Sequence, residues 1–252
     1  MLKDKPKLIA FDLDGTLAES KQRLPAEMGE LLSQLLEKMP VAIMSGASFS
    51  QFEKQVMPAL PDSPYMARLY IFPTNAAQCY HFKDGRWQSA YDQSFNSFEK
   101  SRIMQAIKEA LEETGFANPR EQIWGERIED RGAQISFSGL GQEAPLEAKK
   151  AWDPTGEKKK KIREAIAKRL PDFTVVASGS TTVDITKKGV DKAYGIRKLI
   201  ELAQISVGEM LYVGDALEEG GNDSVVKRTG VHTVDVFGPE ETAILIQGLL
   251  KN

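Results

Sequence analysis

Two aspartates end an apolar run in the stretch Lys7-Leu8-Ile9-Ala10-Phe11-Asp12-Leu13-Asp14-Gly15-Thr16-Leu17. The run from Leu8 to Phe11 is too short for a buried helix and predicts a buried strand, which a Gly-Thr turn follows. Residues i and i+2 of a strand point to the same side, so Asp12 and Asp14 are expected about 7 Å apart. Carboxylates this close repel unless a cation neutralises them, and Mg²⁺ commonly takes one or two carboxylates plus phosphate oxygens. The alternative is a plain strand end with a polar turn.

Composition excludes several classes of function. The 252 residues are 41% hydrophobic and 27% charged, as in ordinary soluble globular proteins. A net charge of -3 gives no reason to expect nucleic-acid binding. The single cysteine, Cys79, fits a reducing cytosol, and no apolar run approaches the roughly 20 residues that span a bilayer. We therefore expect a cytoplasmic protein with a small-molecule substrate and with neither nucleic acid nor membrane as a partner.

Both ends of the chain alternate short apolar strands with amphipathic helices. Strands are predicted over 41–44, 69–72 and 209–213, and helices over 25–36, 194–203 and 239–250. This alternation is typical of βαβ units that build a parallel sheet. The fold class predicted for these parts of the chain is therefore α/β.

The middle of the chain has a different pattern. Asp84-Gly85 predicts a hairpin, alternating strands are predicted over 122–129, 133–138, 173–177 and 181–185, and long helices over 97–115 and 155–170. These elements indicate an antiparallel α+β insertion. We expect core segments at 1–81 and 187–252 and an inserted domain at 82–186. The basic run Lys158–Lys161 within it is interpreted as a solvated helix face, with RNA binding as a weaker alternative.

Polar residues follow three of the core strands, at the ends where parallel α/β sheets form their sites. Ser45-Gly46 follows the second strand, Asp215 follows the strand over 209–213, and Asn222-Asp223 lies in the same glycine-rich loop. Each alone is an ordinary turn, but together they predict one site. Lys192, before a helix, would offset the negative charge of aspartates and phosphate. Asp223 and Asn222 could hold waters of a cation or orient Lys192.

These four segments, in this order, resemble the four motifs of the haloacid dehalogenase superfamily. The insertion lies where that superfamily carries its C2-type cap. The resemblance implies a Rossmann-like core with a parallel sheet and an inserted α+β cap. It implies that Asp12 is the nucleophile, that Asp14 is the general acid and base, and that Lys192 is also catalytic. It further implies that Ser45, Gly46 and Lys192 bind the phosphoryl group, and that Mg²⁺ is held by Asp12, Asp14, Asp215, Asn222 and Asp223.

Within the superfamily, the insertion is similar to the cap of the Cof-like, phosphomannomutase-like branch (C2B). The similarity is carried by residues 127–141, by Thr182-Val183-Asp184 and by residues 190–192. It implies substrate contacts at Arg131, Thr182 and Asp184. After Leu140-Gly141 the mutases place an arginine that binds a second phosphate. This chain has the uncharged Gln142 there, which is a fourth candidate substrate contact.

We therefore expect a Mg²⁺-dependent phosphohydrolase of a small phosphorylated metabolite, with a sugar phosphate preferred, since a phosphatase needs only one phosphoryl site. The alternative is a phosphomannomutase or phosphoglucomutase that interconverts hexose 1- and 6-phosphates. A minor alternative is a non-catalytic binding protein on the same fold. The resemblance also suggests a homodimer formed through the cap.

Overall fold

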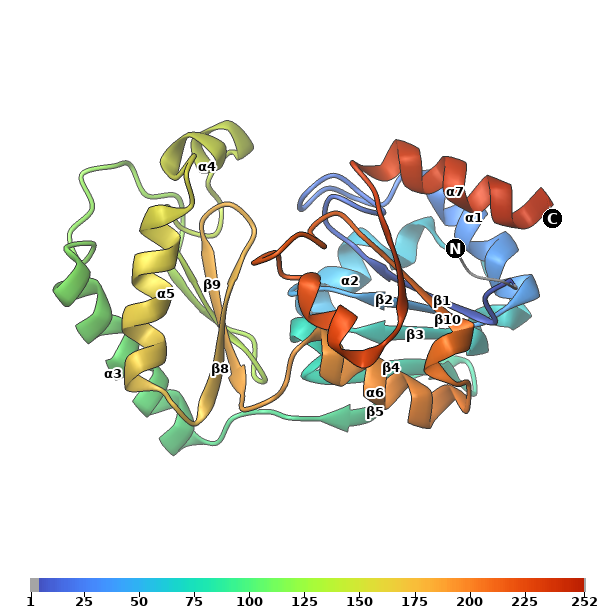
Figure 1. The fold of residues 1–252 in the computed structure, drawn as a ribbon, viewed down its shortest axis with the longest axis horizontal. Helices are drawn as coiled ribbons and strands as arrows, with labels where there is room; N and C mark the ends of the chain where they lie inside the picture. Colours follow the sequence, from blue (N-terminus) through green and yellow to red (C-terminus); the bar gives the residue numbers. More distant parts are fainter. Residues whose placement is uncertain (1–4, 252) are drawn as a thin grey trace. The chain divides into compact units, whose positions relative to one another are not determined.

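The run before Asp12 is strand β1 (Leu8–Asp12) of the computed structural model, which describes residues 5–251. It lies in a seven-stranded sheet of order β11-β10-β1-β2-β3-β4-β5 (Figure 1). The parallel strands beside it are β2 (Val41–Met44), β3 (Leu69–Phe72), β10 (Met210–Gly214) and β11 (His232–Asp235). The antiparallel pair at one edge is β4 (Gln78–Lys83) and β5 (Arg86–Asp92). The predicted α/β class with a parallel sheet is confirmed.

Strand β1 is apolar from Leu8 to Phe11, as expected for a strand in a sheet whose two faces are both covered by helices. Ile9 and Phe11 pack with helices α1 (Ala26–Lys38), α2 (Phe49–Gln55) and α7 (Pro239–Lys251). Leu8 and Ala10 face the opposite way and pack with α6 (Lys192–Ala203). Figure 1 shows α1 and α7 together on one side of the sheet. Each fully buried large apolar side chain contributes about 1.5–3 kcal/mol, so this core fixes the strand that ends at Asp12.

The predicted hairpin at Asp84-Gly85 is present, but its assignment to the inserted domain was wrong. Asp84 and Gly85 have φ of 52° and 72°, as a tight hairpin turn requires. Tyr70 of β3 pairs with His81 of β4, so the hairpin extends the core sheet instead of opening the insertion. Cys79 packs in the same apolar core as Leu8. Contacts divide the chain into a first unit, up to Asp92 and again from Asp191, and a second unit, Gln93–Val190. Both boundaries lie beyond the expected 81 and 186.

The second unit is a four-stranded antiparallel sheet with its own helices. The strand order is β6 (Ile128–Asp130), β7 (Ile135–Ser138), β9 (Thr182–Lys187) and β8 (Phe173–Ser178). Its helices are α3 (Ser97–Thr114), α4 (Leu146–Trp152) and α5 (Glu157–Arg169). Ile135 and Phe137 pack with Ile103 and Ile162 in a separate apolar core. The unit is α+β, as its pattern predicted.

The second unit also contains local structure that the sequence pattern did not predict. The strand expected over 122–129 is regular only at Ile128–Asp130, and helix α4 was not predicted. The helix expected over 155–170 is α5, and at its start the carboxylate of Asp153 accepts the N–H groups of Lys158 and Lys159 at 3.2 and 2.9 Å. That carboxylate satisfies amides that the helix itself leaves free.

Short 3₁₀ segments connect several of these elements: η1 (Met57–Ala59), η2 (Pro64–Arg68), η3 (Thr74–Ala76), η4 (Val207–Glu209) and η5 (Ser224–Thr229). Among the helices of residues 5–251, none has the length and apolar character that crossing a bilayer requires.

Candidate active site

The register of the sheet gathers the polar residues that follow its strands. Phe11 lies opposite Val213 of β10, and Asp12 lies opposite Met44 of β2. Asp215 directly follows Gly214, and Ser45 directly follows Met44. Both therefore lie at the same end of the sheet as Asp12. Parallel pairing therefore turns residues that are distant in sequence into neighbours.

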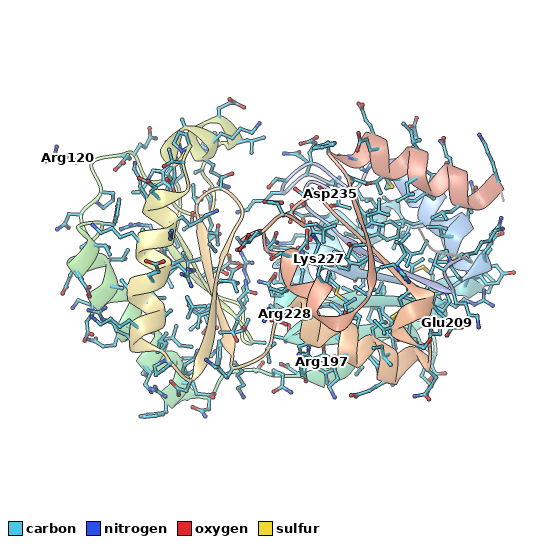
Figure 2. The ribbon with its side chains drawn as sticks, viewed as in Figure 1. Arg120, Arg197, Glu209, Lys227, Arg228 and Asp235 are labelled. Carbon is cyan, nitrogen blue, oxygen red and sulfur yellow. The ribbon has the colours of Figure 1, made fainter. Side chains whose placement is uncertain are left out.

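Lys192 is the buried cation of this cluster, with a side chain that is 1% exposed. It is the first residue of α6, whose N-cap Asp191 accepts the Tyr194 N–H at 2.9 Å. Arg228, labelled in Figure 2, donates to the same Asp191 carboxylate at 3.1 Å. The Lys192 ammonium donates to Asp12 Oδ1 and, at 2.6 Å, to Asp223 Oδ1. Burial lowers the pKa of Lys192, but the two carboxylates outweigh it and hold that pKa above its usual range.

Three carboxylates converge beside this ammonium. Oxygens of Asp12, Asp215 and Asp223 all lie within 4.8 Å of one another. Burial raises the pKa of Asp12 well above its usual value against the opposing charge of Lys192, and burial with Asp223 raises the pKa of Asp215 to about 6. When all three carboxyls are ionised, they and the ammonium carry an excess of two negative charges, which a divalent cation would balance.

The backbone is shaped to leave room for these oxygens. A Cβ at Gly15 would lie 2.3 Å from Asp215 Oδ2, and the φ of Gly15 is +86°, which disfavours other residues. The oxygen-only donor set is the type that Mg²⁺ prefers. The residues present therefore fit the predicted cation.

Asp14 and Ser45 form a second, linked part of the site. Asp14 Oδ1 accepts the Lys21 N–H at 2.5 Å, and Asp14 Oδ2 accepts the Ser45 hydroxyl at 3.4 Å. The Ser45 carbonyl accepts the N–H of Asn75, which lies in a loop of three left-handed residues with φ of 54°, 52° and 63°. Such strained backbone persists only where its surroundings enforce it. The loop after β3 thus holds the loop that carries Ser45 and Gly46.

Asp223 has hydrogen-bond donors on both of its oxygens. Oδ1 accepts Lys192 and the Tyr212 hydroxyl, the latter at 2.5 Å, and Oδ2 accepts the Ala216 N–H at 3.3 Å. Of the two roles predicted for Asp223, these contacts favour the orientation of Lys192. Asn222 lies half-buried one residue earlier in the same loop.

The predicted substrate residues all lie in the second unit. The Arg131 guanidinium is 2.6 Å from Glu129, and its side chain is 7% exposed. Asp184 is buried and accepts the hydroxyls of Ser136, at 2.7 Å, and of Ser178. Thr182, at the start of β9, and Gln142 are half-buried.

Comparison with known proteins identifies the family. The family described as haloacid dehalogenase-like hydrolase matches residues 9–223. This range includes all of the site residues predicted in the first unit, from Asp12 to Asp223. The chain belongs to the haloacid dehalogenase-like hydrolases. The predicted resemblance is thereby confirmed, and the chain is an enzyme of that superfamily.

Relatives match nearly the whole length of this chain. A phosphomannomutase of Encephalitozoon cuniculi is 28% identical, covering 100% of this chain and 96% of its own. The phosphomannomutase of Saccharomyces cerevisiae is 25% identical, covering 99% and 96%. The crystal structure of a haloacid dehalogenase-like hydrolase from Bacteroides thetaiotaomicron superposes with a TM-score of 0.62 at 16% identity, covering 97% of this chain and 100% of that one.

Sequence reasoning missed one residue that contacts the carboxylate cluster, Tyr212. Its ring is fully buried in β10, so the pattern assigned it to the apolar core, where it does pack. The available signal was a hydroxyl in an otherwise apolar strand, two residues before Gly214. A buried tyrosine hydroxyl usually finds a hydrogen-bond partner, and here the partner is Asp223.

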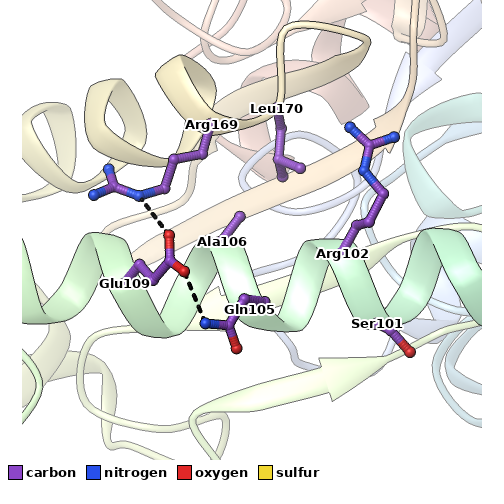
Figure 3. Close-up of a pocket in the computed structure, with 7 residues that line it drawn as sticks. All are labelled: Ser101, Arg102, Gln105, Ala106, Glu109, Arg169 and Leu170. Carbon is purple, nitrogen blue, oxygen red and sulfur yellow. Dashed lines mark hydrogen bonds and ion pairs between the residues drawn. The ribbon is translucent and has the colours of Figure 1, made fainter.

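A hollow on the second unit lies between α3 and α5 (Figure 3). Its charged residues are engaged with one another or with neighbours: Arg169 contacts Glu109 at 3.3 Å, Gln105 donates to Glu109 at 2.7 Å, and Arg102 contacts Asp172 at 2.7 Å. The hollow therefore shows paired surface charges and no group poised for chemistry.

Proposed function

We propose that this enzyme is a Mg²⁺-dependent phosphohydrolase of small phosphorylated metabolites, with a sugar phosphate as the preferred substrate. The observation that carries the proposal is the buried Lys192 ammonium, bound by Asp12 and Asp223 beside Asp215. Phosphoryl transfer depends on positive charge around the transferred group and on a positioned nucleophile. A buried lysine among carboxylates at the end of a parallel sheet supplies both.

The residues divide the reaction into two steps. The Asp12 carboxylate attacks phosphorus, the bond to the leaving oxygen breaks, and an aspartyl-phosphate forms. Asp14 gives its proton to the leaving oxygen and then takes a proton from the water that hydrolyses the aspartyl-phosphate. The Lys192 ammonium, the Ser45 hydroxyl and the Gly46 backbone bind the phosphoryl oxygens. The 3.4 Å contact between Ser45 and Asp14 keeps the proton-transfer group next to the phosphoryl-binding loop.

The carboxylates of Asp12 and Asp215, with the main-chain carbonyl of Asp14, would hold Mg²⁺, Asn222 would support its waters, and Asp223 would orient Lys192 beside it. The cation would neutralise charge on the nucleophile and on the phosphoryl oxygens. This assignment is supported by the oxygen cluster around Asp12 and by the close approach of Gly15 to Asp215.

A phosphomutase is the second candidate, because the relatives that match the whole chain are named phosphomannomutases. A mutase must hold a second phosphate group while the sugar reorients, and that demands uncompensated positive charge. Arg131 is already paired with Glu129 at 2.6 Å, and Gln142 is neutral. These two features favour hydrolysis of the sugar phosphate over transfer of its phosphoryl group to another position of the sugar.

We assign selection of the sugar to Arg131, Thr182 and Asp184 of the second unit. Asp184 is held by hydroxyls from both neighbouring strands, Ser136 on β7 and Ser178 on β8. A carboxylate fixed in this way can accept hydrogen bonds from sugar hydroxyls with little loss of side-chain freedom.

Incubation with mannose 1-phosphate and Mg²⁺ separates the two candidates. We expect inorganic phosphate to exceed mannose 6-phosphate by at least about tenfold, because water competes successfully when a second phosphate is not held. Gln142→Arg should increase the share of mannose 6-phosphate, and Gln142→Ala serves as its control. Conversion to mannose 6-phosphate without phosphate release would establish the mutase instead.

Cation binding should depend on pH through Asp215. Because its pKa is raised to about 6, the carboxyl must lose a proton below that pH before it can bind Mg²⁺. We expect Mg²⁺ affinity, measured by titration calorimetry without substrate, to be about tenfold weaker at pH 5 than at pH 7. Equal affinity at both pH values would show that Asp215 does not take part.

The same shift has the opposite effect on the metal-free protein. A carboxyl whose pKa is higher in the folded state binds its proton more tightly there, so stability is greatest below its unfolded pKa of about 4. That contribution is lost as pH rises through about 6. Asp215→Asn should remove this loss, which thermal unfolding at pH 5 and pH 7 would measure.

A further inference from the structure

Tyr212 is a buried hydroxyl that contacts the machinery of the proposed reaction without contacting its nucleophile. Its ring is fully buried, and its O–H donates to Asp223 Oδ1 at 2.5 Å. The same oxygen accepts the Lys192 ammonium at 2.6 Å. One carboxylate oxygen therefore joins the phenol to the lysine.

The backbone between Tyr212 and Asp215 is built around this contact. A Cβ at Gly214 would lie 2.6 Å from Asp223 Oδ2 and 3.0 Å from the Tyr212 ring. The absence of that side chain lets the Asp223 carboxylate approach β10 closely. Burial, with the negative charge of Asp223, raises the pKa of Tyr212, so its oxygen keeps the proton that it donates.

We propose that the Tyr212 hydroxyl is a positioning group, which fixes Asp223 and through it the Lys192 ammonium that stabilises the transferred phosphoryl group. This inference rests on the proposed function and names a residue outside the family motifs described above. Asp223 accepts the Lys192 ammonium and the neutral Tyr212 hydroxyl on Oδ1 and one backbone donor on Oδ2, so its carboxylate is held in one orientation. Phenylalanine would fill the same core space but would leave Oδ1 with Lys192 alone. The carboxylate could then turn, and the ammonium would follow it.

The test is Tyr212→Phe, which removes one oxygen atom. We expect kcat to fall roughly tenfold, since a hydrogen bond to a charged group is lost, while KM changes less than about twofold. The affinity for orthovanadate, a mimic of the phosphoryl transition state, should fall by the same factor as kcat. Mg²⁺ affinity measured without substrate should change less than about twofold, because the proposed cation ligands are Asp12 and Asp215. Tyr70→Phe, on β3 with its ring beside His81, removes the same atom and should leave kcat and orthovanadate affinity unchanged.

The outcomes separate this inference from the proposed function. Wild-type protein that releases no phosphate from any phosphate ester would contradict the proposed function. An active wild type with an unchanged kcat and unchanged orthovanadate affinity in Tyr212→Phe would overturn the positioning role alone. A drop in Mg²⁺ affinity equal to the drop in kcat would also overturn it, because the hydroxyl would then act on the cation site. If Tyr212→Phe lowers the melting temperature, and its lower activity is fully explained by a smaller fraction of folded protein that binds orthovanadate normally, Tyr212 acts only as a core residue.

Discussion

Replacing Asp12 by asparagine is expected to lower turnover by at least about a thousandfold while leaving the fold intact. An amide cannot displace the leaving group from phosphorus, although it has nearly the shape of the carboxylate. Lys192 would keep Asp223 as a partner at 2.6 Å, so the substitution leaves no buried ammonium without a carboxylate. Steady-state phosphate release measures the loss, and thermal unfolding should shift by no more than about 3 °C.

A matched control removes the same charge elsewhere in the first unit. Asp84→Asn lies in the exposed hairpin turn, where φ is 52° and asparagine is well tolerated. We expect this variant to turn over like the wild type. Activity in Asp12→Asn within about tenfold of the control would remove Asp12 from the role of nucleophile.

Replacing Lys192 by methionine is expected to cost both activity and stability. The change leaves two buried carboxylates, Asp12 and Asp223, without the ammonium that contacts both. Breaking a buried ion pair in this way typically lowers the free energy of unfolding by about 3–5 kcal/mol. For a chain of this size we expect a melting temperature about 10 °C lower at pH 7.5, and turnover reduced at least about a thousandfold.

Added Mg²⁺ should raise the melting temperature of Lys192→Met more than that of the wild type, because the cation offsets carboxylates that have lost their ammonium. Lys198→Met provides the control: Lys198 lies on the same helix, is partly exposed and pairs with Glu201 at 2.7 Å. Surface pairs contribute about 0–1 kcal/mol, so this variant should unfold near the wild-type temperature. Equal melting temperatures for the two variants would show that Lys192 does not neutralise the cluster.

The first unit was largely predictable because its pattern repeats one physical rule. Fully apolar strands of four or five residues can be buried on both faces only in a parallel sheet, and such sheets place polar residues together beyond their carboxyl ends. That rule placed Asp12, Ser45 and Asp215 at one edge, and the observed register agrees. The same rule does not place Lys192 in the site, because a lysine before a helix usually lies on the surface. Its place was predicted only from its position among the other motifs.

The errors arose where tertiary packing decides between equal local patterns. The hairpin at Asp84-Gly85 carries the same local signal in either unit, and only the pairing of Tyr70 with His81 assigns it to the core sheet. Tyr212 read as a core residue because the pattern records that a side chain is buried and does not record what its hydroxyl reaches. The contact of Asp153 with the first amides of α5 was missed because Asp153 lies several residues before the helix begins.

The most direct test of the account is to trap the covalent intermediate. Substrate and Mg²⁺ are mixed with enzyme, the reaction is quenched during turnover, and borohydride reduces any aspartyl-phosphate to homoserine before peptide mapping. We predict homoserine at position 12, dependent on substrate and absent from Asp12→Asn. An enzyme that turns over while position 12 stays aspartate throughout, or that carries the phosphoryl group on another residue, would contradict the account.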